Sequence, residues 1–174
     1  MSYLLGLSGS LRRGATNTKL VHAAAASFGG DFQMGNLRLP LYDGDLEEES
    51  GIPESVQTLA DQIAGAKAVV ISTPEYNKSI SGVLKNALDW VSRTEGSPWK
   101  GKPVAIMSAA AGRAGGERAQ FALRLCMMPF NPLILQGPEV LVAASYEAFD
   151  DDGKLISEQY NKSLDGLMAA LKAA

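Results

Sequence analysis

Short runs of apolar residues alternate along this chain with longer segments in which apolar residues recur every three or four positions. The short runs predict β-strands buried in a sheet, and the longer segments predict amphipathic helices that cover it. Strands are predicted at 3–8, 32–34, 68–72 and 103–108. A fifth strand is predicted within 132–144, either at 139–144 or divided around Gly137-Pro138.

Five segments have the helical period, and in the first of them Leu20, Val21, Ala24 and Phe28 fall on one face. The predicted helices span 19–28, 53–65, 82–93, 117–128 and 156–171. Residues 37–51 contain a proline and several acids without a helical period, so we expect a solvated loop there.

Strands that alternate with helices are typical of an α/β fold with a parallel sheet between two helical layers. Five strands complete the flavodoxin-like three-layer sandwich, in which the parallel sheet has the order 2-1-3-4-5. A chain of 174 residues is the size of one domain, so we expect a single domain over 1–174. Ligands of such sheets lie beyond the carboxyl ends of the strands, so the loops after strands one, three and four should carry the unusual residues.

The loop after the first strand, residues 9–18, has the composition of a phosphate site. It combines two glycines with hydroxyl, amide and guanidinium groups, namely Ser10, Thr16, Thr18, Asn17, Arg12 and Arg13. The first N–H groups of the following helix have no intrahelical partner and favour an anion. Helix capping alone would need fewer of these groups. The loop has no Gly-x-Gly-x-x-Gly and no Gly-Lys-Ser/Thr, which disfavours a dinucleotide fingerprint and a nucleoside-triphosphate hydrolase.

The two later loops are suited to a flat ligand. Residues 73–82 include Pro74, then Tyr76 and Asn77, which offer a planar apolar face beside amide groups. A plain β-turn explains this loop equally well when it is taken alone. Residues 108–116 are mostly alanine and glycine, which would let main-chain N–H groups approach a ligand, although a flexible connection would have the same composition.

Composition excludes several other classes of protein. The net charge of −3 gives no sign of a nucleic-acid or anionic-membrane partner. One cysteine rules out an internal disulfide and a cysteine-rich zinc site, and no carboxylate spacing suggests another metal site. We expect a cytoplasmic protein, because the first apolar run is too short for a signal peptide. His22 and Cys126 are expected to pack or face solvent, and no residue pair resembles a general acid and base.

Three motifs together resemble the NAD(P)H-dependent FMN reductase family, which includes bacterial quinone and chromate reductases. They are Gly-Ser-Leu-Arg at 9–12 with Thr16-Asn17, Thr-Pro-Glu-Tyr-Asn at 73–77, and the segment 82–90. The resemblance implies that the FMN phosphate is held by Ser10, Arg12, Thr16, Asn17 and Thr18. It implies that the isoalloxazine ring is lined by Pro74, Glu75, Tyr76 and Asn77. Ser108 and Gly112 would contact the other ring edge or the ribityl chain.

The resemblance also implies a reaction in which no protein side chain is catalytic, because FMN carries the chemistry. NAD(P)H would pass a hydride to bound FMN and leave, and a quinone, chromate, azo compound or free flavin would then take the electrons, a ping-pong scheme. Lys78 and Arg113 are candidates for anionic substrate groups. A homodimer or homotetramer is implied, with Trp90 and helices 82–93 and 117–128 as candidate contact surfaces, although Trp90 fits a core position equally well.

Two departures from the family pattern are visible. The family usually has proline where this chain has Ser81, which we expect to loosen the start of the next helix, and it usually has serine or glycine within 109–112. Two other functions stay open: a flavodoxin-type electron carrier, which is typically more acidic, and a regulatory module with an empty pocket. The physiological acceptor and the choice between NADH and NADPH are not set by the sequence.

Overall fold

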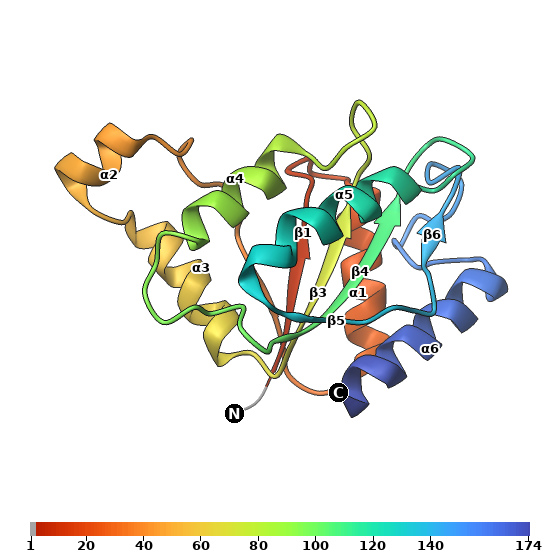
Figure 1. Ribbon diagram of the computed structural model, residues 1–174. Helices are drawn as coiled ribbons and strands as arrows, with labels where there is room; N and C mark the ends of the chain where they lie inside the picture. Colours follow the sequence, from red (N-terminus) through yellow and green to blue (C-terminus); the bar gives the residue numbers. More distant parts are fainter. Residues whose placement is uncertain (1–2) are drawn as a thin grey trace.

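Figure 1 presents a computed structural model of the chain, which describes residues 3–174. Its sheet is parallel, in the order β2-β1-β3-β4-β5, and β6 also pairs with β4. The strands are β1 (Leu4–Ser8), β2 (Phe32–Met34), β3 (Ala68–Thr73), β4 (Pro103–Ala109), β5 (Leu133–Ile134) and β6 (Leu141–Val142). The predicted flavodoxin-like class and strand order are confirmed; Met1 and Ser2 of the predicted domain lie outside the described residues.

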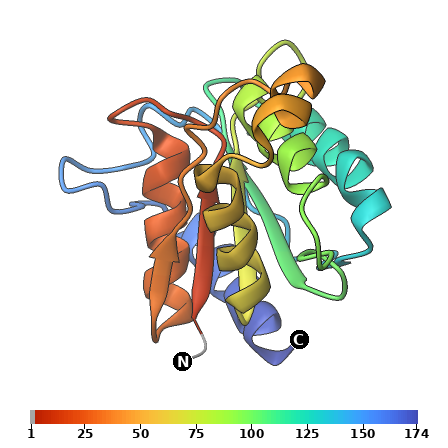
Figure 2. The same ribbon diagram turned by 90° about the vertical axis from the view of Figure 1, so that its left-hand side faces the viewer.

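Helices cover both faces of this sheet (Figures 1 and 2). They are α1 (Thr16–Phe28), α2 (Gly44–Ser50), α3 (Glu54–Gly65), α4 (Gly82–Val91), α5 (Glu117–Met127) and α6 (Glu158–Ala173), with a 3₁₀ turn, η1 (Met128–Phe130), after α5. Helices α1 and α6 pack on one face, and α3, α4 and α5 pack on the other. Among the described residues no helix is both long and apolar enough to cross a membrane.

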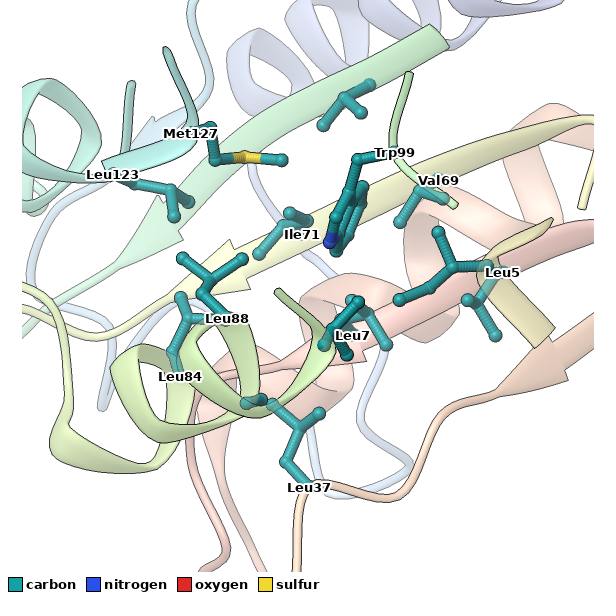
Figure 3. Close-up of a cluster of buried hydrophobic side chains, with 14 of the residues drawn as sticks. Leu5, Leu7, Leu37, Val69, Ile71, Leu84, Leu88, Trp99, Leu123 and Met127 are labelled. Atoms are coloured by element: carbon teal, nitrogen blue, oxygen red, sulfur yellow. The ribbon is translucent and has the colours of Figure 1, made fainter. Parts of the chain in front are cut away.

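The central strands are apolar on both faces because each face meets a helical layer. Leu5, Leu7, Val69 and Ile71 point toward α3, α4 and α5, where Trp99 joins them (Figure 3). The alternate residues of β1 and β3, together with two residues of β4, face α1 and α6: Leu4, Ala68, Val70, Ala105 and Met107. Each fully buried aliphatic side chain contributes about 1.5–3 kcal/mol, so two such cores hold the carboxyl ends of β1, β3 and β4 in fixed register.

The expectation of a solvated loop over 37–51 was wrong in part, because α2 lies within it. The Asp43 side chain caps this helix by accepting from the Asp45 N–H at 3.0 Å, and Gly51 ends it at φ 73°. None of the residues of α2 is buried, so no apolar period marks the helix in the sequence. The Arg93 guanidinium attaches it to the rest of the chain by donating to both carboxylate oxygens of Glu47, at 2.9 and 3.1 Å.

The segment before α2 is bound to α4 by polar contacts that the sequence did not reveal. The carbonyl of Pro40 accepts from Trp90 Nε1 at 2.8 Å and from Asn86 Nδ2 at 2.9 Å. Trp90 is fully buried within the chain, and the ring of Tyr42 meets it edge-on at 5.0 Å. Trp90 was expected either at a contact surface or in the core, and the structure places it in the core.

The fifth strand is divided, as one of the two sequence alternatives had it. Strands β5 and β6 both pair with β4, and the cis peptide Gly137-Pro138 lies between them. Ser81, where the family usually has proline, does not loosen α4: its hydroxyl caps the helix by accepting from the Leu84 N–H at 3.3 Å.

Candidate functional site

The loops after β1 (within residues 9–18), β3 (within residues 73–82) and β4 (within residues 108–116), called loops one, three and four, meet at the edge of the sheet toward which the arrowheads of these strands point (Figure 1). Between them is a cleft of about 210 Å³. Its lining residues come from all three loops and from the segment after β6: Ser10, Arg12, Ala15, Thr16, Asn17, Pro74, Glu75, Tyr76, Ala109, Ala110, Ala111 and Ser145. Of the predicted site residues, Thr18, Asn77, Ser108 and Gly112 are not in this lining.

At one end of the cleft, α1 begins without a cap. The N-cap residue is Ala15, which has no side-chain acceptor, and the first turn contains no acidic residue. The exposed guanidinium of Arg12 and the hydroxyls of Ser10 and Thr16 also line this end. Free helix N–H groups beside a cation and hydroxyl donors form a site for a phosphate-sized anion.

Asn17 supports this end from inside the fold. Its side chain is buried, and its Nδ2 donates to the Ala109 carbonyl at 2.8 Å. Its Oδ1 accepts from Ser72 Oγ at 2.8 Å and from the Ala109 N–H at 3.0 Å. The amide therefore joins α1 to β3 and β4.

Thr18 also acts from beneath the first loop. Its Oγ1 donates to Ser8 Oγ at 2.9 Å, and Ser8 Oγ in turn accepts from the Ser10 N–H at 3.3 Å. These bonds fix the path of the chain at Ser10.

Loop three turns sharply beside the cleft. Tyr76 and Ser79 exchange two main-chain hydrogen bonds, both of 3.0 Å, around Asn77 and Lys78, which have φ values of 50° and 69°. This turn carries Asn77 and Lys78 outward to the rim. The ring of Tyr76 is half-exposed at the cleft, so a flat ligand can stack there.

Glu75 lines the cleft, but its carboxylate is bound elsewhere. One oxygen accepts from the N–H groups of Arg118 at 3.1 Å and Ala119 at 3.3 Å. These N–H groups lie in the first turn of α5, where a helix supplies no acceptor for them, and the N-cap residue Gly116 has no side chain that could accept from them. Glu75 therefore caps α5 and ties loop three to it.

Loop four approaches the cleft through main chain and methyl groups. Ser108 is fully buried; its Oγ donates to the Gly115 carbonyl at 2.6 Å and accepts from Gln120 Nε2 at 2.9 Å. Gly115 has φ 60°, and a Cβ there would lie 2.5 Å from the carbonyl carbon of Leu141, so only glycine fits. Ala109, Ala110 and Ala111 line the cleft, and Gly112 lies outside it.

Ala15 and Ser145 were not among the predicted site residues. Ser145 follows β6, and its position at the carboxyl end of a strand is the signal that could have identified it. The residue before it, Ala144, has φ 42°, a conformation that the sequence does not reveal.

The cleft offers hydrogen-bond donors and an aromatic face. Burial lowers the pKa of the Lys102 ammonium, which donates to the carbonyls of Ala64 and Ala66. Across residues 3–174 no cluster of His, Cys, Asp and Glu could hold a metal ion. A hollow of about 300 Å³ around Trp99 and Phe130 lies outside these loops.

Comparisons with known proteins agree with this geometry. The sequence pattern of the family described as NADPH-dependent FMN reductase matches residues 3–147. A Pseudomonas aeruginosa protein named NAD(P)H-dependent FMN reductase is 38% identical over 172 residues, 97% of this chain and 92% of that protein. An Escherichia coli quinone reductase is 37% identical over 169 residues, 94% and 90% of the two chains.

A solved structure supports the same assignment. It is FerB, a flavoenzyme NAD(P)H:(acceptor) oxidoreductase from Paracoccus denitrificans. It superimposes with a TM-score of 0.88 at 33% identity and covers 99% of this chain and 96% of its own.

Proposed function

The chain belongs to the NADPH-dependent FMN reductase family, and we propose that its cleft holds FMN for the oxidation of NAD(P)H by a quinone or similar small acceptor. The observation that carries this proposal is the uncapped start of α1 beside Arg12, with the half-exposed Tyr76 in the same cleft. A phosphate at one end and an aromatic wall at the other suit a phosphorylated flat ligand.

The residues that fit FMN form two groups, those that would contact it and those that would hold the contacting residues in place. The phosphate would contact Ser10, Arg12, Thr16 and the first N–H groups of α1, and the ring would lie against Pro74, the main chain of Glu75, and Tyr76. We propose that Asn17, Thr18 and Ser108 act by holding these contacts in place, because their side chains are bonded within the fold. Asn77 and Gly112 would contact the flavin from the rim.

The free energy needed to retain FMN requires contacts at both ends of the cleft. Micromolar retention needs about 8 kcal/mol. The helix end supplies roughly 0.3–1 kcal/mol, and hydrogen bonds to a charged group contribute about 1.5–3 kcal/mol each. Because binding also costs rigid-body entropy, the ring contacts at loop three must add to the phosphate contacts.

Bound FMN supplies the hydride chemistry, and the protein supplies position and access. The cleft is smaller than the roughly 300–1,000 Å³ typical of pockets that enclose a small ligand, so one face of the ring would stay open at its mouth. One open face admits NAD(P)H and the acceptor in turn, which is a ping-pong sequence. Quinones, chromate, azo compounds and free flavins all suit such a face. The cytoplasmic location of the protein stays a prediction.

The test is an absorption spectrum of the purified protein, followed by initial rates of NADH and NADPH oxidation with a quinone. We expect a yellow protein, and parallel double-reciprocal lines when both substrates are varied. An electron carrier would bind FMN without steady NAD(P)H oxidation. A colourless protein that takes up no added FMN would refute the proposal.

We also infer a homodimer, the usual assembly of the family, which can pair further into a tetramer. Phe121, Leu125 and Met128 form an exposed apolar stripe on α5 and η1, with exposed fractions of 59%, 68% and 67%. Trp90 is buried and cannot contribute a contact. Light scattering should give twice or four times the chain mass, and Leu125→Glu should reduce it to the monomer; a wild-type monomer would contradict this inference.

A further inference from the structure

Ser145 lies at the phosphate end of the cleft but comes from the far end of the chain. Its Oγ is 3.4 Å from Thr16 Oγ1, at the first residue of α1. Ser145 is 7% exposed and lines the cleft. The loop 9–18 is therefore not the whole of the phosphate end, because Ser145 adds a residue from the segment after β6.

The hydroxyl of Ser145 has hydrogen-bonding capacity left for a ligand. A single contact between the hydroxyls of Thr16 and Ser145 uses one proton of the pair and leaves the other free. Within the described part of the chain neither hydroxyl makes another hydrogen bond. A hydroxyl that lines the cleft and has a proton to spare can donate it to a ligand, and a hydrogen bond to a charged group is stronger than one to a neutral group.

The backbone holds this hydroxyl in place. The Ser145 N–H donates to the Ala110 carbonyl at 3.1 Å, which joins its segment to loop four. Ala144 has φ 42°, a left-handed conformation that is unfavourable for an alanine. Ala148 and Leu155 anchor the same segment in the core against α1 and α6. Strain of this kind persists where the surrounding structure fixes a functional residue.

We propose that Ser145 is a phosphate-binding residue of this cleft, which donates its hydroxyl proton to the phosphomonoester of the flavin. This inference rests on the proposed FMN site and adds a fourth chain segment to it. It follows that Ser145 discriminates FMN from riboflavin, which has the same ring and ribityl chain without the phosphate.

The experiment measures dissociation constants for FMN and riboflavin by fluorescence quenching, with the full-length protein freed of flavin. Ser145→Ala should weaken FMN binding about tenfold or more, as expected for one hydrogen bond to a charged group. Riboflavin binding should stay within about twofold, since its contacts with the ring site are unchanged. Ser27→Ala makes the same chemical change at the other end of α1, where Ser27 contacts Asp165, and should alter neither constant.

A second variant keeps the test decisive if the alanine loosens the segment. Ser145→Asp places a negative charge against the phosphate and should abolish FMN selectivity while riboflavin still binds. Equal losses for both flavins, or no loss for either, would overturn the role of Ser145. A wild-type protein that binds no FMN would instead refute the proposed function, so the two failures are distinguishable.

Discussion

Asn17 gives the sharpest test of how the cleft is built, because its amide, which the family resemblance implies near the phosphate, is bonded to the sheet. We predict that Asn17→Ala lowers the free energy of unfolding as a buried structural substitution does. The side chain is 3% exposed and bridges α1 to Ser72 and Ala109.

The magnitude follows from the three hydrogen bonds of this amide. At a net value of about 1 kcal/mol each, their loss costs about 3 kcal/mol. The alanine also leaves the N–H and C=O of Ala109 and the Ser72 hydroxyl without partners in a buried place, which raises the cost toward about 6 kcal/mol if water does not enter. Domains have only about 5–15 kcal/mol of stability, so this variant should be close to the limit of folding.

Urea and thermal unfolding of flavin-free protein, both followed by circular dichroism, measure the effect. We expect a melting temperature lower by ~10 °C or more for Asn17→Ala. Ser72→Ala removes one of the three bonds and should cost only about 1 kcal/mol. If Asn17→Ala unfolds within about 1 kcal/mol of the wild type while FMN binding is lost, the amide is a ligand and the structural role is refuted.

Three further predictions concern single contacts. Arg12→Ala should weaken FMN binding by about 1.5–3 kcal/mol without changing the urea midpoint, whereas Arg13→Ala, outside the cleft lining, should leave the dissociation constant nearly unchanged. Glu75→Gln should lower the free energy of unfolding by about 1 kcal/mol, because a neutral amide caps α5 less well than a carboxylate; an unchanged urea midpoint would contradict that role. The hydrogen bond from Arg93 lowers the pKa of the Glu47 carboxyl, so this contact stabilises α2 fully above the ordinary carboxyl pKa and is lost as pH falls through the lowered value. The protection of the α2 amides from hydrogen exchange, corrected for the intrinsic pH dependence of exchange, should therefore fall in acid. Glu47→Gln should remove this fall.

The sequence predicted the sheet well because its central strands have one physical explanation. A run such as 68–71 is apolar at every position, and only a strand covered on both faces buries all of it. Helix α2 was not predicted because it buries no residue: Asp43 caps it and Glu47 attaches it, and neither contact leaves a periodic pattern. The hydrophobic period detects burial, and a surface helix held by polar groups gives it no signal.

For the cleft, the sequence located the loops but could not say which way their polar side chains face. The rule for carboxyl ends of parallel strands brought together residues near 10, 75 and 110, which the structure places around one cleft. The same rule applied to the end of β6 would have added Ser145. Residue type cannot separate Ser10, which lines the cleft, from Ser108, which is fully bonded within the fold.

We propose that the side chains of Asn17, Glu75 and Ser108 share a role that differs from ligand contact. Asn17 bonds α1 to the sheet, Glu75 bonds loop three to α5, and Ser108 bonds β4 to Gly115 of loop four. Each holds a neighbouring main-chain segment at the cleft, so the ligand meets N–H groups that are already ordered and pays less entropy on binding. Substitutions at these positions should therefore weaken FMN and riboflavin alike and lower stability with them. Substitutions at Arg12 or Ser145 should instead affect only the phosphorylated flavin, and this difference separates the framework of the site from its contacts.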